Sequence, residues 1–240
     1  MEAKKLGLWG MAICGAALLL GGNAVNAGEA KAVTVKGSDT MVHLSSSWAE
    51  EYMKKNKDAD ISVTGGGSGT GIAAIINGTA DLCNASRKIE EKEIKLAKEK
   101  GVEVKEFVAA LDGISIVVNP ANPVKEITME QLFNLYTGAV KNWKEIGGAD
   151  EPVVLLSREN SSGTYVFFQE HVLKKKDYAK EARLMPATSA IITEAAAAKG
   201  AIGYVGLGYA NEAKGKVKVI PVKDKADGKA VAPSIETVVS

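Results

Sequence analysis

The chain has 240 residues and carries 30 basic and 29 acidic side chains, which gives a formal charge of +1 at pH 7. This balance lacks the basic excess of nucleic-acid-binding proteins, so we expect no nucleic-acid partner. Two cysteines, two distant histidines and no clustered acidic motif provide no ligand set for a metal ion, and we expect no metal and no other cofactor.

The first 27 residues have the features of a secretory signal peptide. Lys4 and Lys5 precede an apolar run from Leu6 to Leu20, and Val25-Asn26-Ala27 forms a small-x-small cleavage pattern before Gly28. The apolar run is shorter than the roughly 20 residues that a membrane-spanning helix needs. We therefore expect cleavage after Ala27 and a soluble protein in the periplasm.

Without this leader the chain has 213 residues with 28 basic and 28 acidic side chains, enough for one large domain or for two lobes of about 100 residues each. Cys83 is then the only cysteine, and in an oxidising compartment it has no partner for an internal disulfide. We expect it to be a buried, small apolar residue.

Strand-like and helical patterns alternate along the chain. Strands are expected at 32–35, 60–64, 81–87, 107–110, 114–118, 153–156, 201–205 and 217–222, and helices at 42–53, 72–76, 90–100, 128–137, 163–173 and 194–199. Asn119-Pro120-Ala121-Asn122-Pro123 breaks the pattern, and the crossing into a second lobe is expected near it. The alternation predicts an α/β fold with mostly parallel sheets flanked by helices.

Hydroxyl side chains follow several of the predicted strands. Ser38 and Thr40 come after the first strand, Ser68 after the second and Ser86 after the third. Because ligands of such sheets bind at the carboxyl ends of the strands, we expect these side chains to reach one crevice.

The segment Arg158 to Thr164 has the pattern of an anion-binding loop. It follows the strand-like run 153–156, and its residues Ser162, Gly163 and Thr164 begin a helical pattern. The first amides of a helix lack intrahelical partners, and the helix dipole favours negative charge there. These amides and the guanidinium group of Arg158 can together bind an oxyanion.

The catalytic motifs of phosphate and acyl chemistry do not fit. The Gly65 to Gly71 run lacks the Gly-Lys-Ser/Thr ending of a P-loop and does not match the dinucleotide fingerprint. Around Ser68 the nucleophile-elbow pattern is broken at its last position, and His43 and His171 both lie in predicted helices. What remains is a set of hydroxyls, glycines and one arginine, which can bind an oxyanion but gives no route to turnover, so we do not expect an enzyme.

Five segments in this order resemble the periplasmic phosphate-binding proteins, the PstS-like substrate-binding components of phosphate ABC transporters: Gly37 to Thr40, Gly67 to Gly71, Ala80 to Arg87, Asp112 to Pro120, and Arg158 to Thr164. Trp143 and Ala201 to Tyr204 also look like that family. The resemblance covers most of 33–222. It implies two α/β lobes joined by a hinge, here 28–117 and 118–222, followed by a tail at 223–240.

By this resemblance the chain would be a monomeric solute-binding protein that takes inorganic phosphate between its lobes and delivers it to an ABC permease. The positions that match the phosphate-contacting positions of the family are Thr40, the Met41 amide, Ser68, Arg158, Ser162, Gly163 and Thr164, and Ser86 is a further hydroxyl donor. Three other functions remain open: a binding protein for sulfate, tungstate or molybdate, an exported phosphate-ester hydrolase, and a sensory or adhesive module.

The chain departs from the family pattern at Arg87. Some members have an aspartate directly after the serine equivalent to Ser86, and it accepts a hydrogen bond from the protonated phosphate oxygen. Without such an acceptor, discrimination against fully ionised sulfate would be weak. Asp112 is our candidate for the replacement, with Asp39 second, while capping or turn chemistry is the alternative for each.

A second departure is length. Family chains usually continue past a segment like 233–240 into a further strand and helix that return to the first lobe, whereas this sequence ends at Ser240. Whether the sequence is truncated or a short variant stays open. In either case the resemblance implies less packing around the first lobe, at a cost in stability.

Overall fold

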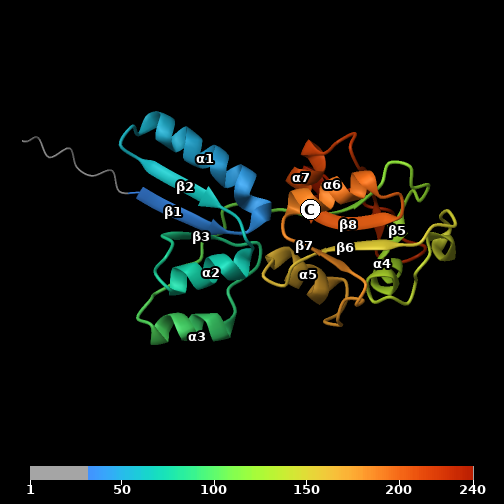
Figure 1. Ribbon diagram of the computed structural model, residues 1–240, viewed down its shortest axis with the longest axis horizontal. Coiled ribbons are helices and arrows are strands. Elements are labelled where there is room, and N and C mark those ends of the chain that lie inside the picture. Colours follow the sequence, from blue (N-terminus) through green and yellow to red (C-terminus); the bar gives the residue numbers. More distant parts are fainter. Residues whose placement is uncertain (1–31, 240) are drawn as a thin grey trace, which may run out of the picture. The chain divides into compact units, whose positions relative to one another are not determined.

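The structure is a computed structural model that describes residues 32–239. The predicted signal peptide at 1–27 and its cleavage site lie outside the described residues. The described part contains a three-stranded sheet, a five-stranded sheet and a two-stranded sheet, with helices packed against them (Figure 1). The predicted α/β fold class is confirmed.

The three-stranded sheet has the order β2-β1-β3, and both of its strand pairs are parallel. Its strands are β1 (Ala32–Gly37), β2 (Asp60–Thr64) and β3 (Leu82–Asn84), and they alternate with helices α1 (Val42–Lys55), α2 (Ser68–Ile76) and α3 (Glu91–Glu99). A short 3-10 turn, Asp39–Met41, leads from β1 into α1. Each of these strands and helices was predicted from the sequence.

The five-stranded sheet has the order β7-β6-β8-β4-β9. Its strands are β4 (Ile114–Val118), β6 (Val154–Arg158), β7 (Arg183–Met185), β8 (Ala201–Gly206) and β9 (Lys218–Ile220). Strand β6 is parallel to β7 and β8, whereas β4 is antiparallel to β8 and β9. This sheet is therefore mixed, and β4, which we had expected at the end of the first lobe, belongs to it.

The remaining elements complete the second half of the chain. They are β5 (Ile127–Thr128), α4 (Met129–Tyr136), the 3-10 turn Trp143–Ile146, α5 (Gly163–His171), α6 (Thr188–Ala197), α7 (Leu207–Glu212), β10 (Val222–Lys223) and α8 (Ile235–Val238). The strand predicted at 217–222 is divided at Pro221, which has no N–H for a ladder hydrogen bond. No helix within 32–239 is both long and apolar enough to span a membrane.

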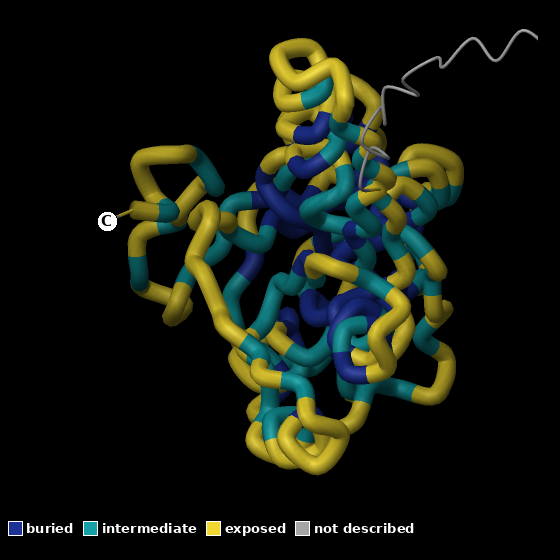
Figure 2. The backbone as a smooth tube through the Cα atoms, turned by 90° about the vertical axis from the view of Figure 1, so that its left-hand side faces the viewer, coloured by how far each residue is buried: buried dark blue, intermediate teal, exposed yellow. Residues whose placement is uncertain are grey.

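Side chains of the five-stranded sheet alternate between two apolar cores, as the pleat of a strand requires. Val118, Leu155 and Tyr204 belong to the core that α4 and Phe168 cover, while Val117 and Leu156 face α6 and α7. The smaller sheet has a core of Ile72, Ile76 and Ala97. Figure 2 shows the buried residues gathered toward the middle of the fold, whereas the residues near the C-terminus are mostly exposed or partly exposed.

The strand predicted at 107–110 does not form. Residues 102–113 have no regular structure, and Phe107 and Val108 are 74% and 80% exposed. The apolar composition of this run favours a buried strand. No strand within 32–239 pairs with it, however: β3 remains an edge of the smaller sheet, and β4 pairs with β8 and β9.

Helix α1 also keeps large apolar side chains on its outer face. Its buried residues are Ser45 and Ala49, whereas Trp48 is 46% exposed and Tyr52 is 55% exposed. Helix α1 therefore presents aromatic side chains at the surface of this part of the chain.

Replacing Phe107 by serine tests the exposure of this segment. We expect Phe107→Ser to change the free energy of unfolding by no more than about 0.5 kcal/mol, as at other exposed positions. The matched core variant Ile116→Ala, at a side chain that is 3% exposed, should cost about 2–5 kcal/mol. Urea denaturation measures both; a loss above about 2 kcal/mol for Phe107→Ser would show that the segment is buried.

Candidate functional site

Four hydroxyl side chains meet at the carboxyl ends of the parallel strands β1, β2 and β3. The Oγ atom of Ser38 lies 2.7 Å from Thr40 Oγ1 and donates a hydrogen bond to Ser86 Oγ over 2.9 Å. Ser86 Oγ lies 3.2 Å from Ser68 Oγ, which also accepts the Ser86 amide. The structure thus brings together the four hydroxyl residues that were expected to reach one crevice, Ser38, Thr40, Ser68 and Ser86.

The N-terminus of α5 lies against this hydroxyl cluster. Ser162 caps the helix, because its Oγ accepts the Tyr165 amide. The amides of Gly163 and Thr164 have no acceptor within 32–239, as expected for the first residues of a helix. A Cβ atom at position 163 would collide with the hydroxyl oxygens of Ser68 and Ser86, so only glycine permits this approach.

The glycine-rich loop before α2 holds the same two segments together. The Gly69 amide donates to the Ser161 carbonyl over 2.9 Å, and Ser161 Oγ donates to the Gly66 carbonyl over 3.3 Å. Gly67 has φ of +91°, and a Cβ there would lie 2.6 Å from the Ser161 carbonyl oxygen. The loop therefore requires glycine at 67 both for its backbone conformation and for its contact with the α5 side.

Arg158, at the end of β6, is 2% exposed and hydrogen-bonded on several sides. Its Nε donates to the Met185 carbonyl over 3.2 Å and its Nη1 to Thr188 Oγ1 over 2.8 Å. Its Nη2 donates to the Pro186 carbonyl over 3.0 Å and to Asp39 Oδ2. Since a guanidinium has five N–H groups, one Nη1 proton is left without an acceptor within 32–239.

The Asp39–Arg158 ion pair joins the two sheets. Asp39 lies in the turn after β1, only 13% of its side chain is exposed, and its other oxygen accepts the Gly66 amide over 3.3 Å. Its backbone carbonyl accepts the Tyr209 hydroxyl of α7 over 2.9 Å. The pair gives the buried guanidinium a counter-charge.

Two predicted residues have local structural partners. The Met41 amide donates to the Ser38 carbonyl within the 3-10 turn, over 3.2 Å. Asp112 Oδ1 accepts hydrogen bonds from the amides of Gly113 and Leu207. Because Leu207 is the first residue of α7, Asp112 caps the N-terminus of that helix although it lies far from it in the sequence. Although Asp112 as a residue is exposed, its carboxylate is crowded by this contact, and the resulting loss of hydration raises its pKa. Oδ2 accepts no hydrogen bond within 32–239 and faces Gly206.

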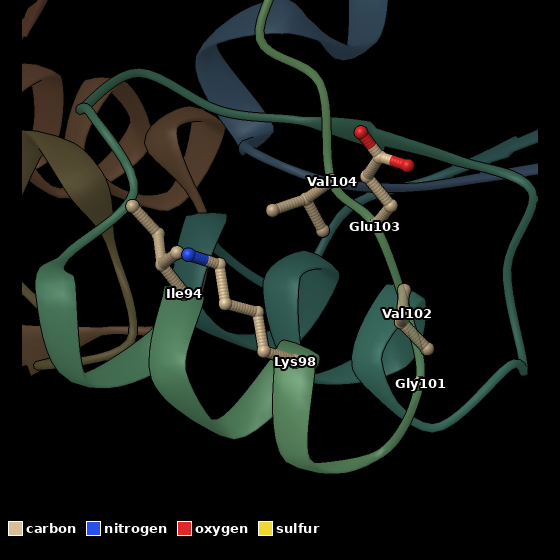
Figure 3. A pocket seen from close by; sticks show the side chains of 6 residues that line it. All are labelled: Ile94, Lys98, Gly101, Val102, Glu103 and Val104. Atoms are coloured by element: carbon tan, nitrogen blue, oxygen red, sulfur yellow. The ribbon is translucent and has the colours of Figure 1, made fainter.

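A surface cavity of about 430 Å³ lies elsewhere, beside α3 (Figure 3). It is lined by Ile94, Lys98, Gly101, Val102, Glu103 and Val104, none of which belongs to the hydroxyl cluster or to the start of α5. We therefore place the candidate site at the strand ends and not in this cavity.

Both histidines lie on helices. The His43 Nδ1 atom is 2.8 Å from Glu212 Oε2 at the surface, and His171 packs on Phe167 at the end of α5. No group of three or more His, Cys, Asp or Glu side chains within 32–239 could hold a metal ion.

Comparison with known proteins decides the family. A model described as a PBP superfamily domain matches residues 24–240. The phosphate-binding protein PstS of Staphylococcus epidermidis is 36% identical over 245 residues, which cover 98% of this chain and 74% of that protein. The chain belongs to the PstS-like family of phosphate-binding proteins.

Solved structures agree with this family. A phosphate-bound structure from Clostridium perfringens, titled as a phosphate ABC transporter substrate-binding protein, is 32% identical with a TM-score of 0.76, covering 87% of this chain and 80% of that one. An ABC-type phosphate transport receptor from Vibrio cholerae is 31% identical with a TM-score of 0.60, covering 82% and 78%. The PstS-like family consists of substrate-binding transport proteins and is not an enzyme family.

Arg87 stands where some members of the PstS-like family have an aspartate, and its guanidinium group is directed toward α3. Its two terminal nitrogens donate to Glu93 over 2.9 and 2.7 Å, and both side chains are mostly buried. The hydrogen bonds from Arg87 hold the pKa of Glu93 below its ordinary value. Arg87 Nε is buried and has no partner within 32–239.

The Arg87–Glu93 pair predicts a pH-dependent contribution to stability. Because the pKa of Glu93 is lowered in the folded state, the contribution is fully present above the ordinary value of 4.5 and is lost as the pH falls through the lowered pKa. We expect Glu93→Gln to lose about 1–2 kcal/mol at neutral pH, a difference that vanishes in acid.

Urea denaturation between pH 7 and pH 3 measures this difference. Glu99→Gln is the matched control, since Glu99 lies on the same helix in an exposed pair with Lys95 and should change stability little. A Glu93→Gln deficit that stays constant down to the lowest pH would contradict the assignment.

Proposed function

We propose that this protein binds inorganic phosphate at the strand-end site and delivers it to an ABC permease in the membrane. It acts without turnover, in the periplasm, after export by the signal peptide predicted at 1–27, and it works as a monomer. The proposal is supported by the family and by the chemistry of the residues that meet at the site.

The main observation behind the proposal is that two sets of hydrogen-bond donors, side-chain hydroxyls and helix amides, lie next to each other. Thr40, Ser68 and Ser86 supply hydroxyl groups from the smaller sheet, while Gly163 and Thr164 supply unpaired amides from α5. A tetrahedral oxyanion accepts several hydrogen bonds at each oxygen, so such a set matches its needs. The helix dipole of α5 adds a favourable field for negative charge.

Arg158 supplies the positive charge in this proposal. Its guanidinium is held in place by Thr188 and by the carbonyls of Met185 and Pro186, so a bound anion meets a cation whose position is already fixed. Its unused Nη1 proton is available to phosphate, and the Asp39 contact is weakened or shared on binding. Pre-positioning lowers the ordering cost that binding otherwise requires.

The two-lobe division also stays part of the proposal. We place the first lobe around the three-stranded sheet and the second around the five-stranded sheet. Because β4 pairs with β8 and β9, the first crossing lies before Ile114 and not after residue 117. Phosphate binding would then support the contact between Gly69 and Ser161, which already joins these parts.

Selectivity against sulfate is assigned to Asp112. Its Oδ2 has no donor within 32–239, whereas both oxygens of Asp39 are engaged, by Gly66 and Arg158. A carboxylate that faces a ligand favours one that carries a proton, and phosphate carries a proton at neutral pH while sulfate does not. Asp39 is in our proposal the structural partner of Arg158.

Replacing Arg158 tests the binding site directly. Arg158→Ala should weaken phosphate affinity by about 2–4 kcal/mol, because a charge-assisted donor is lost and Asp39 is left as an uncompensated charge. Arg183→Ala, at an exposed arginine paired with Glu194, is the matched control and should leave affinity unchanged. Titration calorimetry measures both, and no phosphate binding by the wild-type protein at millimolar ligand would refute the proposed function.

Replacing Asp112 tests selectivity. We expect Asp112→Asn to reduce the preference for phosphate over sulfate by about tenfold, since an amide can donate to an unprotonated oxygen. The readout is competition of sulfate with phosphate at neutral pH. If instead Asp39→Asn relaxes the preference and Asp112→Asn does not, Asp39 is the acceptor. Equal competition by sulfate in the wild type would make the protein a general oxyanion binder.

A further inference from the structure

A chain of buried hydroxyl groups connects the two ends of the Arg158 to Thr164 segment. Ser157 Oγ lies 2.7 Å from the hydroxyl of Tyr204 on β8, and that hydroxyl lies 2.9 Å from the hydroxyl of Tyr178. The Tyr178 hydroxyl donates to the Tyr165 carbonyl, in the first turn of α5, over 3.0 Å. The chain therefore starts beside Arg158 and ends at the helix that carries Gly163 and Thr164.

The direction of these hydrogen bonds follows from the number of protons. Tyr178 has one hydroxyl proton and gives it to the Tyr165 carbonyl, so it must accept the proton of Tyr204. Tyr204 then accepts from the Ser157 hydroxyl over 2.7 Å, the shorter of the two contacts of Ser157 Oγ, since the Arg158 carbonyl lies 3.3 Å from it. The second lone pair of Tyr204 receives the Arg158 amide over 3.4 Å. The order of donation runs from β6 through β8 to α5.

Aromatic packing holds both tyrosine rings in place. The Tyr204 ring stacks on Phe168 of α5 with centroids 4.1 Å apart, and the Tyr178 ring stacks on Tyr165 with centroids 4.4 Å apart. Burial raises the pKa of both tyrosines above the ordinary value of 10.0, so both hydroxyls remain protonated donors at the pH at which the protein works.

We propose that Tyr178 and Tyr204 are positioning residues, whose hydroxyls fix the distance between Arg158 and the amides of Gly163 and Thr164. This inference rests on the proposed phosphate site. The two tyrosines do not touch the anion. They hold the end of β6 and the start of α5 at the separation that lets the guanidinium and the helix amides reach one oxyanion together.

Tyr136 provides a matched control within the same aromatic cluster. It is fully buried, and its hydroxyl lies 3.1 Å from the Leu156 carbonyl and 3.2 Å from the Ile202 carbonyl. Its ring packs edge-to-face on Phe168 and on Tyr204. Its hydroxyl connects β6 to β8 in mid-strand, however, and makes no hydrogen bond to Arg158 or to α5. Removing it costs a buried hydrogen bond without releasing the binding segment.

The experiment compares Tyr178→Phe, Tyr204→Phe and Tyr136→Phe with the wild type, by phosphate titration calorimetry and by urea denaturation. We expect Tyr178→Phe and Tyr204→Phe each to weaken phosphate affinity about tenfold, and the double variant to be little weaker than either, because one break already interrupts the chain. Tyr136→Phe should be destabilised to a similar extent but bind phosphate within about twofold of the wild type.

The outcomes separate the two hypotheses. If the wild type binds phosphate and Tyr178→Phe binds it equally well, the positioning role is refuted while the proposed function stands. If all three variants lose affinity in proportion to their lost stability, the hydroxyls have only a structural role. If the wild type does not bind phosphate, the function and this inference both fail. Should Tyr204→Phe fold poorly, Tyr178→Phe decides, because Tyr178 lies in a loop and is only half-buried.

Discussion

A guanidinium can remain in the interior of a protein only if its charge is compensated and its N–H groups find acceptors. At Arg158 this requirement draws several elements to one point. Thr188 comes from the start of α6, the carbonyls of Met185 and Pro186 come from the end of β7, and Asp39 comes from the other sheet. The position of Arg158 therefore depends on the segment 185–188 and on Asp39, and its ion pair with Asp39 is one of the contacts between the two sheets, beside that of Gly69 with Ser161.

The second requirement is that the backbone of one segment comes very close to groups of another segment, which glycine permits at two positions. Gly163 comes up to the hydroxyls of Ser68 and Ser86, and Gly67 packs on the Ser161 carbonyl. Any Cβ at these positions would push the hydroxyl cluster away from the first turn of α5. In the proposed site the glycines would set the size, while Arg158 would supply the positive charge.

Local signals in the sequence were sufficient to predict most of the helices and strands and the meeting of the hydroxyl side chains at the strand ends. A capping box of Thr128 and Gln131 begins the helix predicted at 128–137, and Ser162 caps α5. Parallel strand ends bring Thr40, Ser68 and Ser86 together, as the alternation of strands and helices implied. These features depend on a few neighbouring residues or on a general rule of parallel sheets, so a single sequence contains them.

Features that depend on a distant partner could not be predicted in this way. The run 107–110 has the apolar composition of a buried strand, but a strand also has to pair with a neighbouring strand, and this run pairs with none within 32–239. Strand β4 was predicted as a strand, yet its place in the five-stranded sheet depends on β8 and β9, which lie about 100 residues further on. Likewise, the sequence does not reveal that Arg87 pairs with Glu93 and is directed away from the hydroxyl cluster.

The charges around Arg158 also bear on which anion the site would prefer. Asp39 already neutralises the guanidinium, and Asp112 Oδ2 borders Gly206, as does the methyl group of Thr40. An anion without a proton would be repelled by both carboxylates, whereas an anion that carries a proton can place that proton between its own oxygen and a carboxylate. Two acidic groups at the proposed site would therefore select for a protonated oxyanion even though Arg87 stands where other members have an aspartate. The unoccupied oxygen of Asp112 makes it the better acceptor of that proton, because Asp39 can accept it only by loosening its hold on Arg158.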